Sequence, residues 1–297
     1  IIDTGIDYTN NVFRYEDGTT KIVSIYDQTN YDSPPPFDFV IGGEYSREQI
    51  NSALASDDPL SVVPVDDPSG HGTFLASIAA GRRDGDFIGA APDAELIVVK
   101  LRPAREYYRR EFLVPPDQEF AFESSAVMLG MEYIYRKAQQ LGKPAAICIG
   151  LGTNLGGHDD LSIFEQYINR ISVSPGFAVC TAAGNEVNAR RHYYGMIRGT
   201  DQPNRVQLRV GANAGDIYLA IWNTAADRVS VAVTSPTGET VERFPAADLG
   251  RLESRLILER STVIIEYFFP TRGWGAQNTV IKILNATPGI WTITLYG

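Results

Sequence analysis

Residues 67–81 of this 297-residue chain read DPSGHGTFLASIAAG, and this segment decides the fold. Its Ala, Ile and Leu residues predict a buried helix that begins near Gly70, with Ser69 as its expected N-cap. Glycines flank His71 on both sides, although each glycine costs roughly 1 kcal/mol inside a helix. Gly70 and Gly72 are expected there if the backbone must let a substrate or a partner side chain approach closely. His71 is therefore predicted to lie beside open space, where a histidine can act as a general base near neutral pH.

A second segment supplies a partner for that base. Residues 1–7 read IIDTGID, which predicts the end of a buried strand opening into a loop at Asp3. In α/β sheets, functional side chains gather at the carboxyl ends of the strands. A carboxylate placed there can accept a hydrogen bond from an imidazole N–H and fix the tautomer of the ring.

A third segment ends another buried strand. Residues 177–186 read FAVCTAAGNE, in which small residues precede Asn185. Small residues leave room for a substrate, and the amide of Asn185 could donate a hydrogen bond to a developing oxyanion. Taken alone, Asn185 after a glycine is also an ordinary turn residue.

Together and in this order, the three segments resemble the subtilisin-like serine proteases, or subtilases. In that family the aspartate lies in I-D-T-G-I, the histidine in G-H-G-T and the asparagine in A-A-G-N, and all three motifs occur here. The resemblance implies that Asp3 orients His71, that His71 is the general base, and that Asn185 helps to form the oxyanion hole. It implies no required cofactor; calcium is possible, but no tight acidic cluster in the sequence specifies a site.

The resemblance also suggests where a substrate binds. Gly150, Leu151 and Gly152 occupy the place of a Ser-Leu-Gly stretch that pairs with the substrate backbone as an added strand. Here Gly150 replaces the serine, so that backbone pairing is kept and one hydroxyl is lost. Ala183 and Gly184 are expected to line the same cleft. The expected partners are a protein or peptide substrate and, in the parent protein, a propeptide.

The family's nucleophile has no counterpart in the sequence. It is a serine in G-T-S-x-A, whereas the Gly-Thr pairs here precede Thr20, Phe74, Asn154 and Asp201. The chain starts within a predicted strand and ends at Gly297, and we expect it to be a piece whose serine lies further on in the parent. Such a piece should be inactive by itself. The alternative is a subtilase-like pseudoprotease that acts as a binding or sensing protein.

The first part of the chain is predicted to be an α/β domain with a parallel sheet covered by helices on both faces, spanning residues 1–195. Continuous apolar runs separated by helical segments carry this prediction. The expected strands are Lys21–Asp27, Glu95–Leu101, Ala145–Leu151 and Phe177–Ala183, and the expected helices are Gly70–Arg82, Ser124–Leu141 and Leu161–Val173. Residues 28–66 and 102–122 are predicted to be surface insertions.

Residues 196–297 are predicted to form a separate antiparallel β-sandwich of jelly-roll type. The expected strands are 206–210, 217–223, 229–234, 255–259, 262–269, 279–284 and 291–295. A β-domain inserted after the oxyanion asparagine narrows the resemblance to the Csp germination proteases of clostridia, which act on the precursor of a spore-cortex lytic enzyme. That subgroup implies a secreted or spore-associated protein.

Composition excludes several functions. The formal net charge of −10 argues against binding to nucleic acid or to an anionic membrane surface, and no apolar run has transmembrane length. The two cysteines, Cys148 and Cys180, are predicted to be free core thiols. A carbohydrate-binding role for the β-domain would need exposed tryptophans at Trp222, Trp274 or Trp291, which core packing explains more simply.

Overall fold

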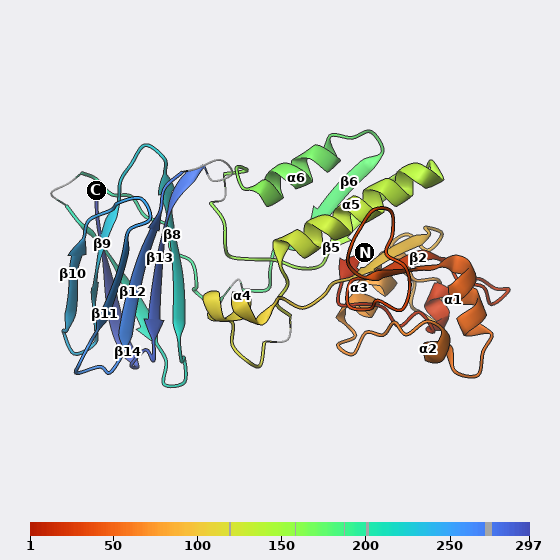
Figure 1. Cartoon of the computed structure of the whole chain (residues 1–297), viewed down its shortest axis with the longest axis horizontal. Coiled ribbons are helices and arrows are strands. Elements are labelled where there is room, and N and C mark those ends of the chain that lie inside the picture. Colours follow the sequence, from red (N-terminus) through yellow and green to blue (C-terminus); the bar gives the residue numbers. More distant parts are fainter. Residues whose placement is uncertain (119, 158, 187, 200–201, 271–274) are drawn as a thin grey trace. The chain divides into compact units, whose positions relative to one another are not determined.

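The computed structural model describes residues 1–118, 120–157, 159–186, 188–199, 202–270 and 275–297 (Figure 1). The chain divides into two compact units. The first comprises residues 1–109, 115–152 and 167–184, and the second comprises residues 110–114, 153–166 and 185–297. The sequence-based domain boundary at residue 195 stays a prediction.

The first unit is built on a six-stranded sheet in the order β3-β2-β4-β1-β5-β6 (Figure 1). All neighbouring strands are parallel except β2 and β3, which are antiparallel. The strands are β1 Ile2–Asp3, β2 Ile22–Asp27, β3 Gly43–Ser46, β4 Leu96–Lys100, β5 Ala145–Ile149 and β6 Phe177–Thr181. The four strands predicted for this region are confirmed, while β3, which is short and lies at the sheet edge, was not foreseen.

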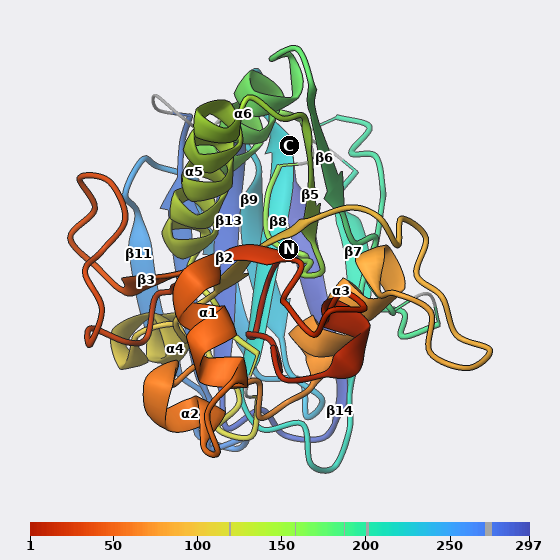
Figure 2. The same ribbon diagram turned by 90° about the vertical axis from the view of Figure 1, so that its right-hand side faces the viewer.

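Helices cover both faces of this sheet (Figure 2). Successive residues of a strand point to opposite faces. Val98 of β4 packs in the same core as Ala76 of α3, whereas Val99 lies against Gly130 of α5. The helices are η1 Asn11–Phe13, α1 Arg47–Leu54, α2 Pro59–Val62, α3 His71–Ala80, α4 Glu106–Glu111, α5 Ser124–Leu141 and α6 Ile163–Ser172. The predicted α/β class and the three predicted helices are confirmed.

The second unit contains two four-stranded antiparallel sheets, in the orders β10-β9-β14-β7 and β11-β12-β13-β8. A single apolar core draws on both sheets, and Trp291 is its largest fully buried side chain. The strands are β7 Asn204–Val210, β8 Ile217–Thr224, β9 Ser230–Thr234, β10 Thr240–Phe244, β11 Arg251–Arg255, β12 Thr262–Phe268, β13 Ala276–Leu284 and β14 Gly289–Tyr296. The predicted antiparallel β-structure is confirmed.

Two details of the strand prediction are wrong. The strand expected at 255–259 is a turn, and the real strand is β11, which ends at Arg255. Ile257 and Leu258 are 79% and 71% exposed, and their backbone N–H groups donate to the carboxylate of Glu239. The sequence also gave no sign of β10, which is short and carries two charged residues.

The prediction that both cysteines are core thiols is wrong for Cys180, whereas the prediction that core packing explains Trp291 is confirmed. Cys180 is exposed rather than part of the core, and Cys148 is half-buried, although both thiols are free. Trp291 is 0% exposed and donates its Nε1–H to the Thr287 carbonyl, so it cannot carry a surface carbohydrate site. Trp274 lies outside the described residues. None of the helices in the described part of the chain is long and apolar enough to span a membrane.

Candidate active site

Asp3 is the last residue of β1, in the interior of the parallel sheet, and its side chain is fully buried. Strands β4 and β5 flank β1 as parallel neighbours, so three carboxyl ends meet at this edge. The Thr4 N–H donates to Asp3 Oδ1 over 2.8 Å. Asp3 Oδ2 has no hydrogen-bond partner among the residues described. One buried carboxylate therefore lies at the sheet edge where α/β folds bind their ligands.

His71 is the first residue of α3, and its Nδ1 lies 2.7 Å from Asp3 Oδ1. The imidazole side chain is 41% exposed, whereas the aspartate is 0% exposed. A carboxylate can only accept, so Nδ1 carries the hydrogen and donates it to Asp3. In the neutral ring the lone pair is then on Nε2, the nitrogen that Asp3 does not occupy. This arrangement makes the ring a general base whose tautomer is fixed by a buried partner.

The two glycines beside His71 serve the backbone rather than a ligand. Gly70 is the N-cap of α3 in the left-handed conformation, with φ of 73°, which glycine adopts without strain. A Cβ on Gly72 would lie 2.2 Å from the Gly5 carbonyl oxygen. The loop after β1 and the first turn of α3 thus touch through their backbones. The close approach predicted from the sequence exists, but the group that approaches is the chain's own Gly5.

Ser69 is not the N-cap, contrary to the prediction, but its hydroxyl still accepts from the His71 N–H over 3.1 Å. The same hydroxyl belongs to a polar cluster around Asp67. Asp67 Oδ1 accepts from the hydroxyls of Thr4 and Ser69, at 2.7 and 2.9 Å. Asp67 Oδ2 accepts from the N–H and the hydroxyl of Thr73, at 2.8 and 2.7 Å. One carboxylate therefore ties the residue after Asp3 to the helix that carries His71.

These donors stabilise the ionised form of the Asp67 carboxylate. Burial would raise the pKa of Asp67, but hydrogen bonds from the Thr73 N–H and from the hydroxyls of Thr4, Thr73 and Ser69 outweigh it and lower the pKa. Thr4 also accepts from the Gly72 N–H over 3.0 Å. Asp67 was not predicted as a site residue from the sequence, although an Asx-type residue just before a helix start is a recognisable signal.

The predicted substrate residues Gly150, Leu151 and Gly152 follow β5, whose Ile149 pairs with Ile2 of β1. They therefore lie at the same sheet edge as Asp3. A Cβ on Gly150 would be 1.9 Å from Leu75 Cδ1 and 2.6 Å from Asp3 Oδ2. Gly150 has no side chain, and Leu75 occupies the space where one would lie. This position therefore supplies no hydroxyl to Asp3 Oδ2.

Ala183 and Gly184 follow β6, the next strand of the sheet, and Gly184 has φ of 85°. The Ala182 N–H donates to the Ile149 carbonyl, which keeps the ends of β5 and β6 together. Asn185 is grouped with the second unit. Its contribution to an oxyanion hole therefore stays a prediction.

Phe120 is a neighbour of the histidine that sequence reasoning did not find. Its ring centroid lies 6.0 Å from that of His71, with an interplanar angle of 35°. It belongs to the stretch 102–122, which we predicted only as a surface insertion. No residue pattern in that stretch marks Phe120, because its approach to His71 depends on long-range folding.

No group of three or more His, Cys, Asp and Glu side chains in the described ranges could hold a metal ion. A family model described as the subtilase family matches residues 1–244. Among solved structures, that of the Clostridium perfringens CspB protease is similar, with 30% sequence identity and a TM-score of 0.81. The match covers 100% of this chain and 60% of that protease chain, so the chain spans 60% of the length of that relative. No curated protein sequence matches the chain.

Proposed function

This chain belongs to the subtilase family, and we propose that it carries the acid–base part of a subtilisin-type serine endopeptidase. The observation that carries the proposal is the 2.7 Å contact between His71 Nδ1 and the fully buried Asp3, made by an imidazole whose side chain is 41% exposed. The family supports a hydrolase that acts on proteins. We place the nucleophilic serine outside residues 1–297, because no Gly-Thr-Ser triplet occurs in the sequence.

In the proposed reaction the serine Oγ attacks the carbonyl carbon of the scissile peptide bond and its proton passes to His71 Nε2. The carbonyl oxygen becomes an oxyanion, to which the Asn185 amide donates a hydrogen bond. The C–N bond then breaks as His71 returns the proton to the leaving amine. Water repeats the sequence on the acyl-enzyme, with His71 as base again. Asp3 stabilises the imidazolium that forms at each step.

We propose that the substrate backbone pairs with Gly150–Gly152 and passes Ala183 and Gly184. These residues follow adjacent parallel strands, β5 and β6, beside the Asp3 edge. The glycines leave the backbone groups accessible to an added strand. The similarity to the CspB protease favours the Csp subgroup and, within it, proteolytic activation of a spore-cortex hydrolase precursor by a secreted or spore-associated enzyme.

The test is peptide hydrolysis by the longer protein that contains this chain. His71→Ala should lower kcat/KM by about 10⁶-fold and Asp3→Asn by about 10⁴-fold, because each removes one member of a unit that acts together. The matched control is His192→Ala, which alters an exposed histidine of the second unit and should leave kcat/KM unchanged. Full activity of the His71→Ala enzyme would exclude the proposed base.

The second candidate is a pseudoprotease that binds or senses a partner, favoured by the lack of a Gly-Thr-Ser triplet in these 297 residues. A serine-directed fluorophosphonate separates the two functions. The 297-residue chain alone should not be labelled, while the longer protein should be labelled if it is a protease. An unlabelled longer protein with an intact fold would favour the pseudoprotease.

A further inference from the structure

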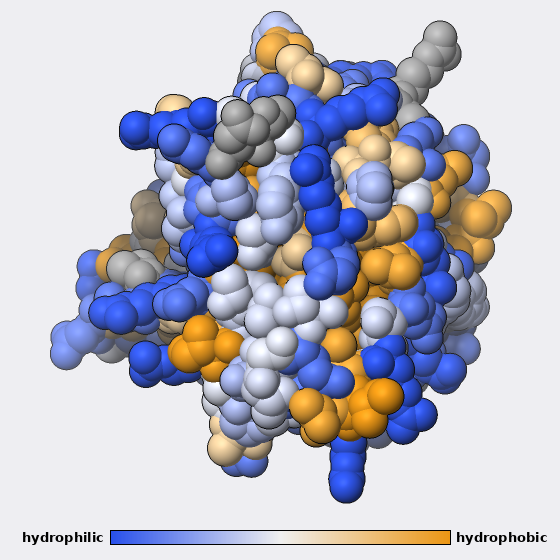
Figure 3. Space-filling view, turned by 90° about the vertical axis from the view of Figure 1, so that its left-hand side faces the viewer, coloured by the Kyte–Doolittle hydropathy of each residue, from blue (hydrophilic) through white to orange (hydrophobic). Residues whose placement is uncertain are grey.

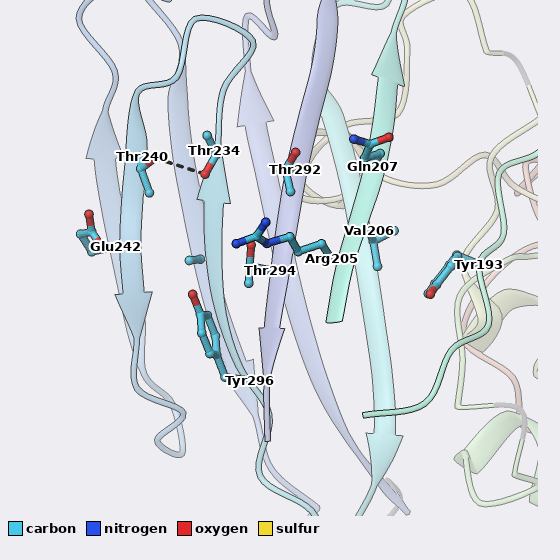
Figure 4. A pocket seen from close by; sticks show the side chains of 11 residues that line it. Tyr193, Arg205, Val206, Gln207, Thr234, Thr240, Glu242, Thr292, Thr294 and Tyr296 are labelled. Atoms are coloured by element: carbon cyan, nitrogen blue, oxygen red, sulfur yellow. Dashed lines mark hydrogen bonds between the residues drawn. The ribbon is translucent and has the colours of Figure 1, made fainter. Parts of the chain in front are cut away.

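The sheet β10-β9-β14-β7 of the second unit has a hollow on its outward face (Figure 4). Alternate residues of these strands enter the core, and the others point outward. The strand register aligns four outward side chains in a single row across the whole sheet, namely Thr240, Thr234, Thr292 and Gln207. The face is therefore an ordered polar surface, as the pale and blue residues along the middle of Figure 3 also indicate.

The hollow has a floor and two walls. Ala232 and Thr294 face each other in the next row and are only 5% and 8% exposed, although they point away from the core. Longer side chains surround them, since Glu242 comes from one edge strand, β10, and Arg205 from the other, β7. The hollow is open to solvent and has a volume of about 590 Å³, in the range of small-molecule binding sites.

The polar groups that line the hollow are available to a ligand. Arg205, Gln207, Glu242, Thr292 and Thr294 make no side-chain hydrogen bond or ion pair with any other residue that the structure describes. Guanidinium, amide and carboxylate groups are planar and can bind two neighbouring hydroxyls at once. This set can donate and accept in several directions within one small space.

Two aromatic rings border the same space. Tyr296, at the end of β14, is held by the Arg243 guanidinium, which lies 4.8 Å from the ring centroid. Tyr193 is fixed by a hydrogen bond from its hydroxyl to Asn204 Oδ1. Aromatic rings offer apolar faces for C–H groups while their hydroxyls stay polar. Free polar groups beside rings are the combination that recognises a sugar.

Other ligand classes fit less well. An apolar molecule would leave the free charges of Arg205 and Glu242 desolvated. An extended peptide is bound through the unpaired backbone of an edge strand, but β9 and β14 under the hollow are paired on both sides. The opposite charges of Arg205 and Glu242 cancel, which disfavours a strongly charged ligand.

We propose that this hollow is a binding site for a neutral oligosaccharide, a role independent of the proposed proteolysis. It replaces the tryptophan-based carbohydrate site considered from the sequence, because the ligand would be bound by side chains of β7, β9, β10 and β14. Sugar hydroxyls would bind the Arg205, Gln207 and Glu242 groups, and a ring face would lie against a tyrosine.

The test is isothermal titration calorimetry of the 297-residue chain with maltohexaose, xylohexaose and chitohexaose. At least one should bind, and Arg205→Ala should weaken that binding at least about tenfold. Ala232→Leu should abolish it by filling the floor of the hollow. The matched control is Arg209→Ala, on the same strand as Arg205 but outside the hollow, which should leave the affinity unchanged.

Absence of binding heat with all three hexasaccharides would overturn the proposal. So would sugar binding that Arg205→Ala and Ala232→Leu both leave unchanged, because the sugar would then lie elsewhere. Melting curves verify the fold of each variant, and Arg205→Ala decides the result if Ala232→Leu does not fold. Binding of a tryptic peptide mixture that Ala232→Leu abolishes, without a sugar response, would replace the oligosaccharide by a peptide.

Discussion

Asp67→Asn is the sharpest test of how the base and its carboxylate are held together. The Thr73 N–H donates to Asp67 Oδ2, and a backbone N–H can act only as a donor. The amide oxygen of the new side chain in Asp67→Asn must therefore take the place of Oδ2. The new NH2 group then faces the hydroxyls of Thr4 and Ser69, which donated to the carboxylate. The Thr4 hydroxyl cannot easily change from donor to acceptor toward residue 67, because it already accepts from the Gly72 N–H. Two charge-assisted bonds are therefore lost or weakened.

Hydrogen bonds to a charged group contribute about 1.5–3 kcal/mol each and neutral ones about 1 kcal/mol. The substitution should thus lower the free energy of unfolding of the first unit by about 2–4 kcal/mol. At about 2–4 °C per kcal/mol, the melting temperature should fall by about 4–16 °C. The control is Asp66→Asn, which alters the exposed partner of the Lys100 ion pair and should cost less than about 1 kcal/mol.

The two units can be followed separately, since all three tryptophans, at positions 222, 274 and 291, belong to the second. Asp67→Asn should shift the urea transition seen by far-ultraviolet circular dichroism and leave the tryptophan fluorescence transition in place. In the longer protein, kcat should fall by up to about 10²-fold if Asp3 and His71 move apart by about 1 Å.

The pH dependence gives a second check of the same reasoning. The pKa of Asp67 is lowered in the folded chain from its ordinary value of 3.8, so its stabilisation is fully present above that pH. It is lost as the pH falls through the folded pKa. The stability gap between the wild type and Asp67→Asn should therefore shrink below pH 3.8. A gap no larger than that of Asp66→Asn, or one that persists unchanged in acid, would refute the role of Asp67.

Two other predictions test contacts in each unit. Gly150→Ser should destabilise the first unit, because the new Cβ would be 1.9 Å from Leu75 Cδ1, and Leu75→Ala in the same chain should recover part of the loss in a urea titration. Hydrogen bonds, chiefly from Thr237, outweigh burial and lower the pKa of Glu259 to about 2, so the second unit should lose this stabilisation as the pH falls from 4.5 to about 2. Glu259→Gln should flatten that part of the fluorescence-detected stability profile, and a profile as steep as the wild type would show that Glu259 is not responsible.

The parts of the fold that could be predicted are those with a strong apolar pattern. Strands β2, β4, β5 and β6 are mainly apolar runs separated along the chain by helices, and this pattern predicts a parallel sheet, although β6 itself contains no buried residue. The errors fall on edge strands. β10 and β11 each pair with only one neighbouring strand. They carry charged residues, as edge strands often do, so no apolar run marks them in the sequence. The apolar pair Ile257-Leu258 was mistaken for a strand because an exposed turn can also carry apolar residues.

The residues of the candidate site also divide into those that a local sequence pattern marks and those that it does not. Asp3 and His71 were found because each lies in a short motif whose residues are adjacent in the sequence. Asp67 was within the quoted segment, yet its importance comes from Thr4, which is 63 residues away. Phe120 approaches His71 from a stretch without any distinctive pattern. Local patterns therefore identify the reacting groups, whereas the residues that hold them depend on contacts that only the folded chain shows.

The glycine beside the base changes meaning for the same reason. From sequence, Gly72 was expected to let a substrate or a partner side chain approach closely, but the backbone of Gly5 already occupies that space. Any side chain at Gly72 would separate the loop after β1 from the first turn of α3, and with them Asp3 from His71. The small residues of this motif therefore set the distance between carboxylate and imidazole, while the Asp67 cluster sets their orientation. A close contact between two backbones, rather than space for a ligand, is what the Gly-His-Gly pattern encodes here.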